Sequence, residues 1–93
     1  MAKSNVVKLP EKLDISGVEA LFREFRDLVE KGGSVRLDAS RVKRADTAGM
    51  QLLYSLQKTL AEQGAKAAVA DPSEDFMTCV RLTGFDKVLA FNQ

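Results

Sequence analysis

Three stretches of the chain carry apolar residues at the spacing of an amphipathic helix. In the first, from about residue 16 to 31, the apolar positions are Val18, Leu21, Phe22, Phe25, Leu28 and Val29. Ser16 and Glu19 form a capping-box pattern at its start, and Gly32-Gly33 supplies a stop. The pattern therefore predicts a helix with Phe22 and Phe25 both in the core.

The second and third helical stretches lie in the other half of the chain. One should begin near Asp46 or Thr47, either of which can cap it, and end near Gln63 with Gly64 as the stop. Its expected inner stripe is Leu52, Leu53, Leu56 and Leu60. The other should follow Pro72 and close at Gly84. Its expected inner face is Phe76, Cys79, Val80 and Thr83.

Four short β-prone segments separate these helices. They are Asn5–Leu9, Val35–Ala39, Ala65–Ala70 and Val88–Phe91, and the second alternates apolar and polar residues. A polar loop covers residues 40–45. Strands that alternate with helices favour parallel pairing. We therefore predict an α/β fold, with a small, mixed, mostly parallel sheet covered by about three helices.

Composition narrows the possible functions. The chain has 93 residues, of which 45% are apolar and 29% charged, which is typical of one globular domain spanning 1–93. It contains no His and one Cys, Cys79. Imidazole-based catalysis, His or Cys-pair metal sites and an intrachain disulfide are thereby excluded. The remaining Asp and Glu residues fall mostly on predicted exposed faces, so we expect no enzyme activity, metal or other cofactor.

Charge and hydropathy exclude further classes. The net charge of +1 is far from the basic footprint of a nucleic-acid-binding domain. No apolar run approaches the length of a membrane span, and residues 1–10 do not resemble a signal peptide. We therefore expect a cytoplasmic protein with no nucleic-acid partner and no direct membrane insertion. Cys79 lies on an apolar helix face and is expected to be a core residue.

The most informative segment is Asp46-Thr47-Ala48-Gly49-Met50, where the polar loop meets the second helix. A helix start exposes backbone N–H groups and the positive end of the helix dipole. A phosphate on Thr47 would lie in that field and would add about −1.5 to −2 charges. From local physics alone, the simpler interpretation is that Thr47 is the N-cap.

This segment resembles the signature of STAS domains, the fold shared by anti-sigma-factor antagonists and the cytoplasmic tails of sulfate transporters. That signature is an Asp, a Ser or Thr, a small residue, Gly and an aliphatic residue at the start of the second long helix. Leu13-Asp14, the apolar strand ending in Asp38, and Leu82-Thr83-Gly84-Phe85 also resemble family positions. The resemblance covers nearly the whole chain from about Val6.

The resemblance implies a regulatory interaction module in which Thr47 is the phosphoacceptor. In anti-sigma-factor antagonists, the unmodified domain binds a kinase-like, ATP-binding anti-sigma factor, and phosphorylation reverses the binding. The partner-binding residues expected here are Arg44, Asp46, Thr47, Ala48, Gly49, Met50, Gln51 and Tyr54. Arg41, Lys43 and Arg44 could steer an acidic partner or hold a phosphate, or they could belong to a solvated loop.

Two other functions remain open because this chain departs from the antagonist pattern. Antagonists usually have Ser as the acceptor and often a second hydroxyl residue next, whereas this chain has Thr47 and Ala48. Asp-Thr-Ala-Gly is similar to a STAS subunit bound to the ATPase of a lipid-transport ABC complex. A third group of small STAS proteins accompanies chemotaxis receptors. The Gly that commonly precedes Leu13-Asp14 is absent, and the short N-terminal strand leaves truncation of one strand open.

Overall fold

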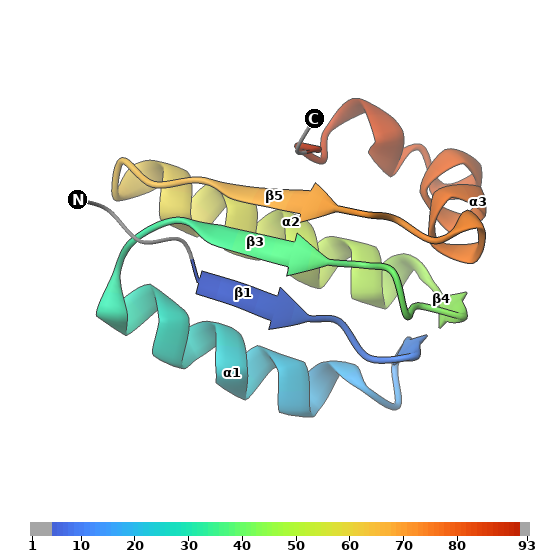
Figure 1. The fold of residues 1–93 in the computed structure, drawn as a ribbon, viewed down its shortest axis with the longest axis horizontal. Coiled ribbons are helices and arrows are strands. Elements are labelled where there is room, and N and C mark those ends of the chain that lie inside the picture. Colours follow the sequence, from blue (N-terminus) through green and yellow to red (C-terminus); the bar gives the residue numbers. More distant parts are fainter. Residues whose placement is uncertain (1–4, 92–93) are drawn as a thin grey trace.

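Three parallel strands form the main sheet of the computed structural model, which describes residues 5–91 (Figure 1). The strands are β1 (Asn5–Lys8), β3 (Val35–Asp38) and β5 (Ala67–Ala70), in the order β1-β3-β5. Val7, Leu37 and Val69 lie side by side across them and are buried. Because every pairing of the main sheet is parallel, the carboxyl ends of its strands lie at the same edge.

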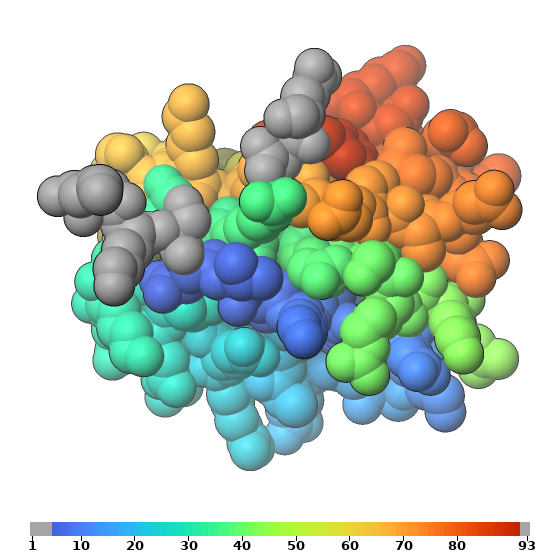
Figure 2. All heavy atoms as spheres, in the orientation of Figure 1, coloured from blue at the N-terminus to red at the C-terminus, as the bar shows by residue number. Residues whose placement is uncertain are grey.

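Helices cover one face of this sheet. Helices α1 (Val18–Lys31) and α2 (Thr47–Glu62) pack against that face, and α3 (Glu74–Thr83) lies beyond the end of β5 (Figure 1). The opposite face points toward the viewer in Figure 2. Val6 and Arg36 alternate with the buried Val7 and Leu37 along their strands, so their exposed side chains belong to this opposite face. The predicted parallel α/β fold with three helices is confirmed. Within residues 5–91, no helix is long and apolar enough to cross a membrane.

A second, two-stranded sheet was not predicted. It pairs β2 (Lys12–Leu13) with β4 (Arg44–Ala45) in parallel. The carbonyl oxygen of Glu11 accepts hydrogen bonds from the backbone N–H groups of Lys43 and Arg44, at 2.8 and 2.9 Å. The predicted polar loop therefore ends in a strand whose backbone is fixed directly ahead of α2.

The predicted capping box at the first helix is wrong. Helix α1 begins at Val18 after Gly17, and no side chain caps it. The Ser16 hydroxyl and its backbone N–H both donate to Asp14, and Glu19 instead pairs with Arg23 one turn along the helix. Asp14 is two residues from Ser16, whereas Glu19 is three residues away. Ser16 therefore forms a local turn with Asp14 in place of the capping box with Glu19.

The predicted last strand is also wrong. Residues 85–87 form a short 3₁₀ helix, η1 (Phe85–Lys87), and only Phe91 makes an isolated bridge to Val69. The Gln57 side chain on α2 donates to the Val88 carbonyl at 2.8 Å and accepts from the Ala90 N–H at 2.7 Å. These backbone groups are therefore satisfied by α2 instead of by a neighbouring strand.

The core lies between the sheet and the two helices α1 and α2. Helix α2 contributes the buried side chains of Met50, Leu53, Leu56 and Leu60, whereas Leu52 is partly exposed. The prediction that Phe22 is a core residue is wrong, because its side chain is 51% exposed while Phe25 is 3% exposed. The buried face of α1 is narrower than its apolar stripe, and Phe22 lies at the edge facing α2.

Candidate functional site

Asp46 fixes the start of α2. Its carboxylate accepts a hydrogen bond from the Gly49 N–H at 3.1 Å and another from the Ile15 N–H at 3.3 Å. Its own N–H donates to the Leu13 carbonyl at 3.2 Å. Asp46 is therefore the N-cap, and the simpler interpretation of Thr47 as the cap is wrong. Thr47 is the first residue of the helix and is exposed.

The last two residues of the signature are buried beneath the start of α2. Gly49 and Met50 are buried, and Met50 is 0% exposed. A Cβ atom on Gly49 would overlap the Leu13 carbonyl oxygen and lie 2.8 Å from Leu13 Cγ. Neither residue is exposed in this conformation, and their contact with a partner stays a prediction. The close approach of Gly49 to Leu13 holds the start of α2 against the end of β2, and so it sets where Thr47 lies.

An exposed stripe extends from Thr47 along α2. Thr47, Gln51, Tyr54 and Lys58 follow the spacing that places residues on one side of a helix. Tyr54 is partly buried against Phe85, with ring centroids 6.5 Å apart in a T-shaped arrangement. The Lys58 ammonium lies 5.7 Å from the centroid of the Tyr54 ring. Ala48 faces the other way and lines a groove beside α1.

On its other side, Thr47 borders an open hollow shared with α3. Lys43, Arg44 and Asp46 line one wall. The α3 wall includes Asp75, Thr78, Cys79 and Leu82. The Leu82 side chain is 83% exposed, which is unusual for a large apolar residue. Sequence reasoning missed Asp75, Thr78 and Leu82, although their outer positions on the third helix follow from its predicted inner face.

Charged residues border the hollow on both sides, with Lys43 and Arg44 ahead of α2 and Asp75 on α3. Lys43 and Arg44 are exposed, and neither lies in an ion pair among the residues that the structure describes. Burial, with a smaller contribution from the Asp46 carboxylate, raises the pKa of the Cys79 thiol, so Cys79 is protonated at neutral pH. Cys79 is only partly buried, packed at the margin of the core.

Two acidic residues near the sheet edge are held in their charged form. The Ser16 hydroxyl donates to Asp14 and lowers the pKa of that carboxyl below its ordinary value of 3.8. The Ser40 backbone N–H lowers the pKa of Asp38 in the same way.

Across residues 5–91, no group of three or more His, Cys, Asp or Glu side chains is arranged to hold a metal ion. The arrangement presents an exposed hydroxyl, two cations and an exposed leucine, which suits protein binding.

A family model described as "Mlab, STAS domain" matches residues 2–90. The chain belongs to the STAS domain family. The residues that carried the resemblance, from Asp46 to Met50, form the N-cap and first turn of α2. No curated protein sequence was found to match the chain.

Solved structures of STAS proteins share this fold. The anti-sigma factor antagonist SpoIIAA in its unphosphorylated form superposes with a TM-score of 0.78 at 16% identity, over 100% of this chain and 83% of that one. The phosphorylated form of Bacillus SpoIIAA superposes with a TM-score of 0.72 at 16% identity, over 100% of this chain and 86% of that one. An anti-sigma factor antagonist-like protein from Thermotoga maritima superposes with a TM-score of 0.78 at 22% identity, over 95% of this chain and 79% of that one.

Proposed function

We propose that this STAS domain is a non-enzymatic protein-interaction module of the anti-sigma-factor antagonist type. Its partner is a kinase-like, ATP-binding protein, and phosphorylation of Thr47 switches the binding off. The observation that carries this proposal is the position of Thr47. Its side chain is exposed at the first turn of α2, while the adjacent Asp46 takes the capping role that would otherwise occupy a hydroxyl.

The proposed contact surface combines the exposed stripe of α2 with the hollow beside α3. Arg44, Thr47, Gln51 and Tyr54 are the contacts from the basic loop and α2. The exposed Leu82 supplies an apolar contact next to them. A protein interface commonly combines an apolar centre with a polar rim, and this surface offers both.

Phosphate on Thr47 would change this surface in two ways. It would add about −1.5 to −2 charges beside the Asp46 carboxylate, and it would bring a strongly hydrated group into a packed contact. Both effects weaken an interface that accepts the neutral hydroxyl. A loss of about 3 kcal/mol lowers affinity more than a hundredfold, which is enough for a switch. The solved phosphorylated and unphosphorylated forms of SpoIIAA support this type of regulation for the fold.

The test captures tagged protein from native lysate and identifies what co-purifies by mass spectrometry. Wild type should retain a kinase-like, ATP-binding protein, and Thr47→Glu should lose it. Thr47→Ala should bind and resist release. Ala20→Glu is the matched control, because it places the same charge on an exposed position of α1 that lines neither the hollow beside α3 nor the groove between α1 and α2. Retention of the same kinase-like protein by Thr47→Glu would refute the switch.

A second candidate uses the same surface without a switch. Here the domain is a constitutive subunit on the ATPase of a lipid-transport ABC complex, and Thr47 is an interface contact. Ala48 favours this candidate, because the second hydroxyl residue common in antagonists is absent. In that case Thr47→Ala and Thr47→Glu should both weaken binding to an ABC ATPase. The response to Thr47→Ala therefore separates the two functions.

A further inference from the structure

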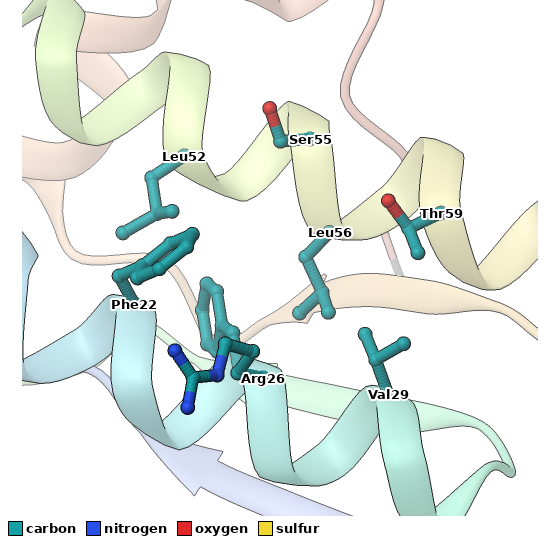
Figure 3. Close-up of a pocket in the computed structure, with 8 residues that line it drawn as sticks. Phe22, Arg26, Val29, Leu52, Ser55, Leu56 and Thr59 are labelled. Atoms are coloured by element: carbon teal, nitrogen blue, oxygen red, sulfur yellow. The ribbon is translucent and has the colours of Figure 1, made fainter.

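The groove between α1 and α2 lies apart from the hollow beside α3. Its apolar walls are formed by Phe22, Phe25 and Val29 on α1 and by Leu52 and Leu56 on α2. We call this surface the α1/α2 groove. Figure 3 shows Phe22 facing Leu52 across it, with Arg26 on the α1 wall. Phe22 is 51% exposed, so the groove presents a large aromatic side chain to solvent.

The hollow in the groove is large enough for another aromatic side chain. Its volume is about 190 Å³. Apolar cavities of about 150 Å³ accommodate benzene. The phenyl ring of Phe22 borders this hollow and also the adjoining one near Val18 and Ala48. A protruding ring therefore stands next to an apolar depression on the same surface, which is the shape a self-complementary contact requires.

The charges along the groove are also self-complementary. Two charged residues of α1 border these two hollows. Arg26 lines the α1/α2 groove, and Glu19, which also pairs with Arg23 in its own helix, lines the adjoining hollow. They are seven residues apart, about two helical turns or roughly 10 Å, with Phe22 between them. An antiparallel second copy of α1 would therefore bring Glu19 opposite Arg26 twice, once from each copy.

We propose that the α1/α2 groove binds the same groove of a second copy of this chain. The two α1 helices pack antiparallel about a two-fold axis near Phe22, and each Phe22 ring enters the partner groove beside Leu52. Two Glu19–Arg26 pairs flank the rings. Because the contact is confined to one groove of each copy and its charged pairs are exposed, the dimer should form in the micromolar range.

Sedimentation velocity across about 5–500 μM protein tests the proposal, a range set by the micromolar expectation. Wild type should shift from monomer to dimer, and Phe22→Ala should raise the dissociation constant at least about tenfold, as expected for a central aromatic contact. Circular dichroism confirms that the variant is folded. A wild type that stays monomeric throughout, or a Phe22→Ala variant that dimerises like wild type, overturns the proposal.

Charge exchange tests the antiparallel geometry itself. Glu19→Arg and Arg26→Glu should each weaken dimerisation about tenfold, because like charges then face each other twice. An equimolar mixture of these two variants should dimerise like wild type, since both opposed pairs are restored between unlike copies. Glu24→Arg is the control, because Glu24 is exposed on α1 but does not line the groove. A mixture as monomeric as its components overturns the arrangement.

Discussion

The backbone of Gly49 packs directly against the carbonyl group of Leu13. Leu13 ends β2, and Gly49 lies in the first turn of α2, so this contact joins two segments that are far apart in the sequence. The Asp46 carboxylate strengthens the junction by accepting the Ile15 N–H. The exposed position of Thr47 therefore depends on a close approach that only glycine permits.

Gly49→Ala should destabilise the domain because the added methyl group meets backbone atoms that cannot rotate away. We expect a loss of about 1–3 kcal/mol in the free energy of unfolding, the usual cost of overpacking. Urea denaturation measures this loss. Ser55→Ala, at an exposed position of the same helix, is the control and should change stability by less than about 0.5 kcal/mol. Equal stability of the two variants would contradict the close packing at Gly49.

Asp46→Ala should lower stability by about 1–2 kcal/mol through loss of the N-cap. Asp46→Asn should lose less, because its side-chain oxygen can still accept the Gly49 N–H. Thermal unfolding of both variants checks this order. If Thr47→Ala cost as much as Asp46→Ala, the assignment of Asp46 as the cap would be wrong.

Leu53 and Phe22 should respond very differently to truncation. Leu53 is 0% exposed, so Leu53→Ala should cost about 2–5 kcal/mol of stability. Phe22 is half exposed, so Phe22→Ala should cost less than the roughly 3–5 kcal/mol typical of a buried phenylalanine. Denaturant unfolding, performed at a low protein concentration where the chain is monomeric, compares the two. A larger loss of stability for Phe22→Ala than for Leu53→Ala would show that the buried face of α1 is assigned incorrectly.

Gln57→Glu should loosen the segment after α3. The new carboxylate cannot donate to the Val88 carbonyl, which the Gln57 amide now does at 2.8 Å. Loss of such a hydrogen bond costs about 1 kcal/mol, enough to speed local opening severalfold. Hydrogen exchange of the amides in residues 88–91 should therefore accelerate, while the amides of β3 should not. Unchanged exchange throughout residues 88–91 would show that the hydrogen bond from Gln57 to Val88 does not restrain this segment.

Asp14 and Asp38 should make the domain sensitive to acid. Hydrogen bonds hold the pKa of each carboxyl below its ordinary value of 3.8 in the folded state. A lowered pKa in the folded state means that these groups contribute their full stabilisation above pH 3.8, and that it is lost as the pH falls through their folded values. Asp38→Asn should flatten the acid limb of the stability profile, measured by denaturation at a series of pH values. An unchanged limb in both Asp38→Asn and Asp14→Asn would contradict these shifts.

Features that depend on nearby residues could be predicted from the sequence. The start of α2 at Asp46 or Thr47, its end near Gln63 and the buried Leu53 and Leu56 all follow from local periodicity and capping. The Asp46-to-Met50 segment also identified the family, which the match to residues 2–90 confirms. Thr47 as phosphoacceptor and the residues expected to bind a partner stay predictions.

Features that depend on distant residues could not be predicted. The pairing of Leu13 with Ala45 in the second sheet, and the capture of Val88 by Gln57, join residues more than thirty positions apart. The exposure of Phe22 depends on how α1 and α2 lie side by side, which periodicity within one helix does not report. The failed capping box at Ser16 is different, because its competitor, Asp14, was visible in the sequence.

The phosphorylation state of Thr47 in the protein's native cells tests the central proposal most directly. The endogenous protein should be separated into partner-bound and unbound fractions, and the peptide containing Thr47 should be quantified in each by mass spectrometry. We expect unmodified Thr47 in the bound fraction and phosphorylated Thr47 in the unbound fraction. The absence of phosphate on Thr47 from both fractions, or equal phosphorylation in the two, would contradict a phosphorylation-controlled partner switch.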